Sequence, residues 1–339
     1  MKRRSYRLSK VGSLNNLNLV TEEINPPSED EVTIEIRAIG LNFADVFTIA
    51  GLYKASPKEN FIPGLEFSGV IIDKGRNVTD FHINDKVMGS VKFGSYTSHL
   101  NLDHRYIIKL PNDWTFEEGA SFIVQALTAY YALVPLGNIT SNQNVLIHSA
   151  AGGVGIYANR IAKKFSAFTI GTIGSSSKYN LLKSEGYDEI IIRNGNFKNE
   201  LKEKLNGKKL DLVLDAIGGK IQKDSFDLLT TTGRMVAYGL SQFASHSARP
   251  NYLKLALHFI TMPRYQTLTL IESNKSILGF NLIWLYERVD QLRNMLHEIE
   301  KLNLEKPYVG KVFDFDHLIE AVKVFQSGRT MGKVVVKNY

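Results

Sequence analysis

A glycine-rich bend is the most informative stretch for chemistry, because it joins an apolar strand pattern to a helical one in VLIHSAAGGVGIYANRIAKKF, residues 145–165. Ala150, Gly152 and Gly155 occupy the three glycine positions of the G-x-G-x-x-G pattern, with alanine first. In this context the pattern predicts a dinucleotide site. Backbone N–H groups of Gly152 and Gly153 would face a pyrophosphate, and Gly155 would let the helix pack on the strand. The alternative is a tight strand-to-helix connection that binds no nucleotide.

The end of the next predicted strand indicates which dinucleotide is bound. An NAD site usually has an Asp or Glu about 20 residues after the glycines, which bonds the ribose 2′-hydroxyl. This chain has GTIGSSSKYN there, with Ser175, Ser176 and Lys178 but no carboxylate, and Arg193 closes the following strand, EIIIR. Hydroxyls and cations suit a 2′-phosphate, so we predict NADPH. The alternative is that Lys178 and Arg193 are solvated surface cations.

Three polar side chains nearer the amino terminus could also take part in chemistry. Tyr53 can donate a hydrogen bond to a substrate carbonyl at neutral pH, since an unperturbed tyrosine has a pKa of about 10. An aromatic ring that only packs on the substrate is the alternative. For Asp45 and Glu66, structural hydrogen bonding is favoured over a paired acid and base. The eight histidines show no metal-ligand spacing with one another.

Composition limits the class of protein. The 339 residues exceed the usual size of one domain, so two lobes are expected. The net charge of +7 is spread over interleaved acidic and basic residues, which argues against nucleic-acid binding. There is no cysteine for a disulfide or a thiolate metal ligand, and a cytoplasmic location fits. No uninterrupted apolar run reaches the roughly 18 residues of a membrane-spanning helix, so no integral membrane segment is expected.

The elements that must position these residues are of two kinds. Short strands separated by Gly, Pro, Asn and Asp predict a compact β lobe over residues 32–110. Residues 115–134 predict a linking helical region, with Thr115 and Glu118 in capping-box spacing. From residues 144 to 239, aliphatic strands alternate with helical segments, which predicts a parallel sheet covered on both faces. An amphipathic helix in LYERVDQLRNMLHEIEKL and a strand in GKVVVKNY complete an α/β fold.

Motifs along nearly the whole chain resemble the zinc-free quinone oxidoreductase branch of the medium-chain dehydrogenase/reductase superfamily. They include GLNFADVFTIAGLY, PGLEFSGVI, HSAAGGVG, DLVLDAIGG, GRMVAYG and MGKVVV. Within that branch, HFITMPRYQTLTLIESN and NKSILGFNLIWL resemble the vesicle amine transport protein homologue group. The resemblance implies a Rossmann doubly wound parallel sheet plus a GroES-like β-rich catalytic domain. Residues 1–125 would begin the catalytic domain, 126–266 would form the NADPH-binding domain, and 267–339 would return to the catalytic domain.

The resemblance also implies a reaction without zinc. Zinc-dependent members of the superfamily carry a catalytic cysteine, a GHE histidine and a cysteine-rich loop, whereas this chain has no cysteine and has Leu65 at the histidine place. Hydride transfer from NADPH to an electron-poor acceptor is then favoured, since it needs only positioning and hydrogen bonds. The expected substrate is a small lipophilic quinone or α,β-unsaturated carbonyl, and the expected assembly is a homodimer.

Site residues are carried over from the family position by position. Asn42 and Tyr53 match polar residues that flank the nicotinamide, and both are candidates for catalysis. The other matches are Thr128 near the nicotinamide ribose, Gly152, Gly153 and Val154 at the pyrophosphate, Ser175, Ser176, Lys178 and Arg193 at the 2′-phosphate, Tyr238 and Gly239 over the ribose, Phe280 and Leu282 in the GF-L strip, and Lys333 in the closing loop. One departure is Phe47, where several relatives have a second tyrosine.

Two other functions stay open. The apolar segments YLKLALHFITM and SILGFNLIWLY, within residues 251–286, could form a substrate wall, a subunit interface or a face that contacts a membrane. A lipid-surface or partner-binding protein without catalysis is therefore one alternative. The other is an enoyl-thioester reductase that resembles the reductase modules of polyketide synthases, which share the same lobes and glycine loop.

Overall fold

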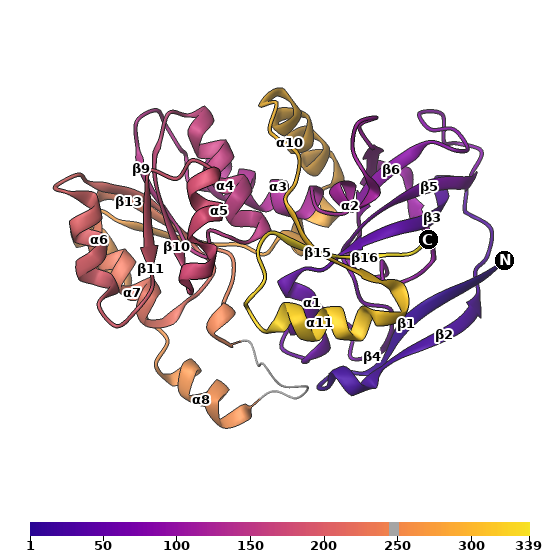
Figure 1. Ribbon diagram of the computed structural model, residues 1–339, viewed down its shortest axis with the longest axis horizontal. Coiled ribbons are helices and arrows are strands. Elements are labelled where there is room, and N and C mark those ends of the chain that lie inside the picture. The colour runs from indigo at the N-terminus through magenta and orange to yellow at the C-terminus, as the bar shows by residue number, and fades with distance from the viewer. Residues whose placement is uncertain (244–250) are drawn as a thin grey trace.

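Two lobes lie side by side in the computed structural model, which describes residues 1–243 and 251–339 (Figure 1). One lobe, here called the terminal lobe, holds both ends of the chain. The other, here called the central lobe, is formed by the chain between them.

The terminal lobe is built on two sheets. The smaller sheet has the strand order β2-β1-β4, and the larger has the order β15-β16-β3-β5-β6-β8, with β7 also paired to β3. The strands are β1 (Lys2–Lys10), β2 (Leu17–Glu23), β3 (Glu31–Gly40), β4 (Glu59–Phe61), β5 (Glu66–Lys74), β6 (Lys86–Ser90), β7 (His99–Asp103), β8 (Ile107–Lys109), β15 (Val309–Asp314) and β16 (Lys333–Lys337). Helices α1 (Phe43–Ile49), α2 (Phe116–Gly119) and α11 (Leu318–Gln326) pack beside them. The β lobe predicted over residues 32–110 is confirmed.

The central lobe has a six-stranded parallel sheet in the order β11-β10-β9-β12-β13-β14. Counted from β9, this is the 3-2-1-4-5-6 order of doubly wound dinucleotide-binding folds. The strands are β9 (Asn144–Ile147), β10 (Phe168–Ile173), β11 (Glu189–Ile192), β12 (Leu210–Asp215), β13 (Leu229–Ala237) and β14 (Ser276–Gly279). The predicted parallel α/β sheet is confirmed. Because β14 belongs to it, the sheet extends past residue 266, where the sequence places the end of the middle segment.

Helices cover both faces of this sheet, which explains why its strands are continuously apolar. Helices α4 (Gly153–Lys164) and α5 (Tyr179–Ser184) pack in one core, and α6 (Phe197–Leu205) and α7 (Gly219–Leu228) pack in the other. Neighbouring residues of β9 divide between them, with Val145 in the first core and Leu146 in the second. Between β13 and β14 the chain forms α8 (Tyr252–Ile260) and α9 (Thr267–Ser273).

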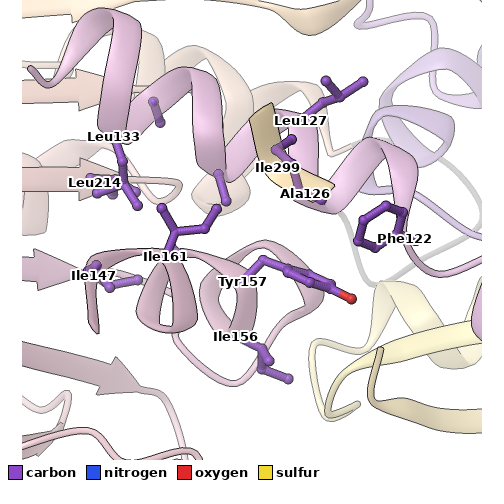
Figure 2. Close-up of a cluster of buried hydrophobic side chains, with 14 of the residues drawn as sticks. Phe122, Ala126, Leu127, Leu133, Ile147, Ile156, Tyr157, Ile161, Leu214 and Ile299 are labelled. Carbon is purple, nitrogen blue, oxygen red and sulfur yellow. The ribbon is translucent and has the colours of Figure 1, made fainter. Parts of the chain in front are cut away.

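The linking region contains α3 (Ile123–Tyr131) and a π-helical turn, Ala132–Leu136. Figure 2 shows side chains of α3 and α4 packed together, with Ile299 from α10 (Val289–Lys301) in the same cluster. The predicted capping box is present at α2, since the Thr115 N–H donates to Glu118 at 2.7 Å and the Glu118 N–H donates to Thr115 at 3.2 Å. This core fixes the linking region against the central lobe.

One helical stretch among the described residues, Phe116–Leu136, is long and apolar enough to cross a membrane by length and composition alone. Most of it is buried inside the protein, as expected for the core helix of a globular fold.

Candidate active site

A cleft of about 1800 Å³ lies between the two lobes. Its central-lobe wall is formed just beyond the carboxyl ends of the parallel strands, which is where open α/β sheets bind ligands. The residues in this position are Ser149 after β9, Gly174 after β10, Arg193 after β11, Ala216 after β12, Tyr238 after β13 and Phe280 after β14. The terminal lobe supplies the facing residues, among them Asn42, Tyr53, Leu65 and Lys333.

The predicted site residues line this one cleft, with a single exception. Asn42, Tyr53, Thr128, Gly152, Gly153, Val154, Ser175, Lys178, Arg193, Tyr238, Gly239, Phe280, Leu282 and Lys333 all contribute to its walls. Ser176 does not, and Ser177 lines the cleft in its place. The difference arises because Ser175 caps the short 3-10 turn Ser176–Lys178 by accepting the N–H of Ser177. The structure therefore brings the residues together, while their roles remain predictions.

The glycine loop presents free backbone donors to the cleft. The Gly152 N–H donates to the Ser149 carbonyl at 2.9 Å, which closes the bend. Gly153 and Val154 begin α4, so no carbonyl of the same helix can accept their N–H groups. These two N–H groups, together with the positive end of the helix, are suited to an anion.

Two further glycines allow close backbone contacts around this loop. A Cβ on Gly155 would lie only 2.6 Å from Ala150 Cα, so α4 could not approach the end of β9 with a larger residue there. The packing role predicted for Gly155 is thereby confirmed. On the terminal lobe, Gly332 has φ +58° and donates its N–H to the Ala151 carbonyl at 2.8 Å. The closing loop therefore rests directly on the glycine loop.

Lys178 and Arg193 place two cations at one end of the cleft. Arg193 Nη1 donates to the carbonyl and Oγ1 of Thr172, at 3.1 and 2.9 Å, and Lys178 Nζ donates to the Gly328 carbonyl at 2.7 Å. Burial lowers the pKa of both cations, and repulsion from Arg193 lowers that of Lys178 further. The carboxyl of Asp215 opposes the shift of Arg193. An anion at this end of the cleft would remove the repulsion.

The Tyr53 hydroxyl bridges the two lobes. Its Oη donates to Asn281 Oδ1 at 2.6 Å, although the two residues are 228 positions apart in the chain. Burial raises the pKa of Tyr53 to about 12, so the hydroxyl keeps its proton at neutral pH. Tyr53 follows α1 and Asn281 follows β14, and both line the cleft.

A buried polar network forms the floor of the cleft beside Tyr53. Lys333 Nζ donates to Glu66 Oε2 at 2.6 Å and to Asn42 Oδ1 at 2.8 Å. Gln125 Nε2 donates to the same two atoms, at 2.8 and 3.0 Å. The other Glu66 oxygen accepts the Val124 N–H at 3.0 Å. The structural hydrogen bonding predicted for Glu66 is confirmed.

The amide of Asn42 is fully engaged in this network. Its Oδ1 accepts from Lys333 and Gln125, while its Nδ2 donates to the Gly40 carbonyl at 3.1 Å and to Glu66 at 3.4 Å. An acceptor oxygen in the cleft would therefore compete with protein partners for Asn42. This favours Tyr53 over Asn42 as a hydrogen-bond donor to a substrate.

Comparison with known proteins gives the family. The zinc-binding dehydrogenase family matches residues 186–336, and the alcohol dehydrogenase GroES-like domain matches residues 28–112. The synaptic vesicle membrane protein VAT-1 homolog of Homo sapiens is 30% identical over 335 residues, covering 97% of this chain and 85% of that protein. The chain belongs to the medium-chain dehydrogenase/reductase superfamily. It is an oxidoreductase of that superfamily by this membership.

Solved structures of the superfamily superpose on the whole chain. The CurK enoyl reductase has a TM-score of 0.85 and 28% identity, covering 99% of each chain. The quinone oxidoreductase of Escherichia coli complexed with NADPH has a TM-score of 0.81 and 25% identity, covering 99% of this chain and 100% of that one.

One histidine, His148, directly follows β9 beside the glycine loop. His148 is buried, with its ring nitrogens 2.9 Å from Thr172 Oγ1 and Ser225 Oγ, and burial lowers its pKa to about 3. The ring is therefore neutral and structural. Among the described residues, no three His, Asp or Glu side chains converge as metal ligands.

The residues of this dehydrogenase/reductase cleft that sequence reasoning missed include Gln125, Asn281 and Arg329. Gln125 lies one turn before the predicted Thr128, and Asn281 lies between Phe280 and Leu282, so helical spacing and adjacency were the available signals. Arg329 directly follows Gly328, whose carbonyl accepts from Lys178, and it adds a third cation to the same end of the cleft.

Proposed function

We propose that this protein is an NADPH-dependent oxidoreductase that transfers hydride to a quinone or an α,β-unsaturated carbonyl without zinc. The observation that carries the proposal is the convergence of the glycine loop, two cations and the Tyr53 hydroxyl in one cleft. The likeness to a quinone oxidoreductase complexed with NADPH supports it.

The residues of the cleft fit NADPH. The N–H groups of Gly153 and Val154 would hold the pyrophosphate at the start of α4. Lys178 and Arg193 would hold the 2′-phosphate, because an anion removes the repulsion between two partly desolvated cations. When bound, NADPH supplies the hydride.

Next to the acceptor, the chain would supply a hydrogen-bond donor and apolar side chains. The protonated Tyr53 hydroxyl would donate to the acceptor oxygen, on which negative charge develops during the reaction. Leu41, Phe43 and Leu65 line the same cleft and would exclude water from the reacting atoms. A quinone or enone suits such a site, because conjugation delocalises the developing charge.

The preference for NADPH over NADH tests the coenzyme that the proposal assigns. Purified protein should bind NADPH more tightly than NADH, and Lys178→Ala or Arg193→Ala should each weaken NADPH binding by about tenfold, the value of one charge-assisted bond, while leaving NADH unaffected. Lys183→Ala is the matched control, since it removes an exposed cation of α5 that does not line the cleft. Equal affinity of the wild-type protein for both nucleotides would refute the coenzyme assignment.

An enoyl-thioester reductase is the second candidate, and the 28% identity to the CurK enoyl reductase favours it. NADPH consumption measured over quinones, enals, enones and enoyl-thioesters separates the two. We expect turnover of quinones or enones. Turnover of enoyl-thioesters alone would establish the second candidate instead.

A further inference from the structure

The cleft continues past the predicted coenzyme contacts to α8. Leu255, Ala256, Phe259 and Ile260 line it, so one face of this helix forms part of the wall. The volume of about 1800 Å³ is larger than the roughly 300–1,000 Å³ of ordinary ligand pockets. The cleft therefore has room for more than a nucleotide and a small ring.

The α8 wall is apolar and open to water. Phe259 is 70% exposed and Ile260 is 71% exposed, although both line the cleft. On other positions of α8, Leu253 and Leu257 are also exposed. Figure 1 shows α8 projecting from the rest of the central lobe. Contiguous exposed apolar side chains on a folded protein usually mark a binding surface.

Apolar side chains also line the cleft on the terminal lobe. Phe43 and Phe47 come from α1, and Leu52 follows that helix and is 40% exposed. These residues are close in sequence to Tyr53, the proposed donor to the acceptor oxygen. One cleft thus joins a reactive end, with a hydroxyl and a buried cation, to an apolar end at α8.

We propose that the acceptor carries a long apolar tail, an isoprenoid or alkyl chain, which lies against Leu255, Phe259 and Ile260 while its electron-poor head is near Tyr53. This rests on the proposed function. A membrane or a second copy of the chain could cover Leu253 and Leu257 from outside. The face of α8 that lines the cleft is instead within reach of a ligand in the cleft, which is why a tail is the occupant favoured here.

Quinones that share one head group and differ only in tail length test this inference. We expect kcat/KM to rise about tenfold or more with each of the first two isoprenoid units, because a methylene removed from water tightens binding by up to about fourfold. An equal kcat/KM for the tailless and tailed quinones would overturn the inference.

Paired variants locate the tail. In Phe259→Ser/Ile260→Ser, the ratio of kcat/KM between the longest and the tailless quinone should fall at least tenfold. The matched control is Leu268→Ser/Ile271→Ser on α9, whose residues are 63% and 69% exposed but do not line the cleft, and its ratio should not change. An equal loss in both variants would overturn the inference, as would a change in molar mass by light scattering that is confined to the α8 variant, which would make α8 a subunit interface.

Failure of the proposed function is separable from failure of this inference. If NADPH binds but no quinone is reduced at any tail length, the proposed reaction fails. Isothermal titration calorimetry with the oxidised quinones then still measures how the dissociation constant depends on tail length. A dissociation constant that falls with tail length in the wild-type protein, but not in the α8 variant, supports the inference, and one that is independent of tail length overturns it.

Discussion

At the scale of single residues, the proposed reaction depends on which side chain donates a hydrogen bond to the acceptor oxygen. Tyr53 keeps its proton at neutral pH, because the ordinary tyrosine pKa of about 10 already lies well above neutrality and burial raises it to about 12. Its bond to Asn281 Oδ1, at 2.6 Å, must be exchanged for a bond to the acceptor before the hydroxyl can assist the reaction. Under the proposed function, Asn281 would hold the donor in place between turnovers, and its hydrogen bond with Tyr53 connects the two walls of the cleft.

Replacing Tyr53 by phenylalanine should lower turnover by up to about a hundredfold, since one donor to a developing oxyanion is typically worth a few kcal/mol. NADPH binding should be unchanged, because the glycine loop and the two cations remain. Steady-state kinetics and fluorescence titration with NADPH measure the two effects separately. Asn281→Ala is the companion variant, and it should cost less turnover because it leaves the hydroxyl in place. A wild-type rate for Tyr53→Phe would mean that water or Asn42 donates the hydrogen bond to the acceptor oxygen, and that Tyr53 only packs against the substrate.

Among the elements, the start of α4 depends most strictly on one residue. An added Cβ at Gly155 would lie 2.6 Å from Ala150 Cα and 2.7 Å from the Ala150 carbonyl oxygen, so α4 would have to move away from β9. Gly155→Ala should cost about 1–3 kcal/mol of unfolding free energy. It should also weaken NADPH binding more than tenfold, because the N–H groups of Gly153 and Val154 move with the helix.

Gly195→Ala is the control for that prediction, since a Cβ there meets nothing within 4 Å. Its unfolding free energy should stay within about 0.5 kcal/mol of the wild-type value. Urea unfolding and NADPH titration of both variants give the comparison. Full NADPH affinity in Gly155→Ala would show that the position of α4 does not govern coenzyme binding.

Some helices and strands could be predicted from the sequence alone, and others could not. The parallel strands and their helices were predictable because β9 to β13 are aliphatic runs bounded by helical periodicity and turn residues. Strand β1, the middle strand of the smaller sheet, was not, since most residues of Lys2–Lys10 are polar and read as an unstructured terminus. The π-helical turn at Ala132–Leu136, which contains Pro135, has no distinct sequence pattern.

The floor of the cleft could not be predicted for a different reason. Lysine is almost never fully buried without a partner, and the partner of Lys333 is Glu66, 267 positions away in the chain. Periodicity in the sequence indicates which face of a helix or strand is buried. It does not indicate which charged residues, far apart in the chain, form an ion pair. Lys333 entered the predicted site through family resemblance alone, and its ion pair emerges only from the paired strands β3, β5 and β16.

In the whole molecule, hydrogen bonds join the carboxyl-terminal part of the terminal lobe to its amino-terminal part. Lys333 of β16 contacts Glu66 of β5, and Tyr6 of β1 donates to the Asp316 carbonyl at 3.1 Å. Next to the network lies Asp45, which accepts the Asn42 N–H at 2.8 Å and is almost completely buried. The stability of the terminal lobe should therefore respond to the protonation of Asp45.

The sign of that response follows from the direction of the shift. Burial raises the pKa of Asp45 from about 3.8 to about 7, so the folded protein holds this proton more tightly than the unfolded chain does. The stabilisation from the bound proton is complete below about pH 4 and is lost as pH rises to about 7. Asp45→Asn removes the titratable carboxyl, so the unfolding free energy of this variant lacks the pH dependence that comes from Asp45. The unfolding free energy of the wild-type protein minus that of Asp45→Asn should fall by about 2–3 kcal/mol between pH 5 and pH 8.

Urea unfolding at a series of pH values measures this difference, and Asp103→Asn provides the control. Hydrogen bonds from Arg105 hold the pKa of Asp103 below its usual range, so that carboxyl is ionised in the folded and unfolded states throughout pH 5 to 8. The difference between the wild-type protein and Asp103→Asn should therefore be flat over this interval, and should shrink only as pH falls below about 4. A difference for Asp45→Asn that is equally flat would mean that Asp45 is already ionised in the folded protein at pH 5. The Asn42 N–H and the nearby Lys333 ammonium would then outweigh burial, and the network would carry a second negative charge beneath the cleft.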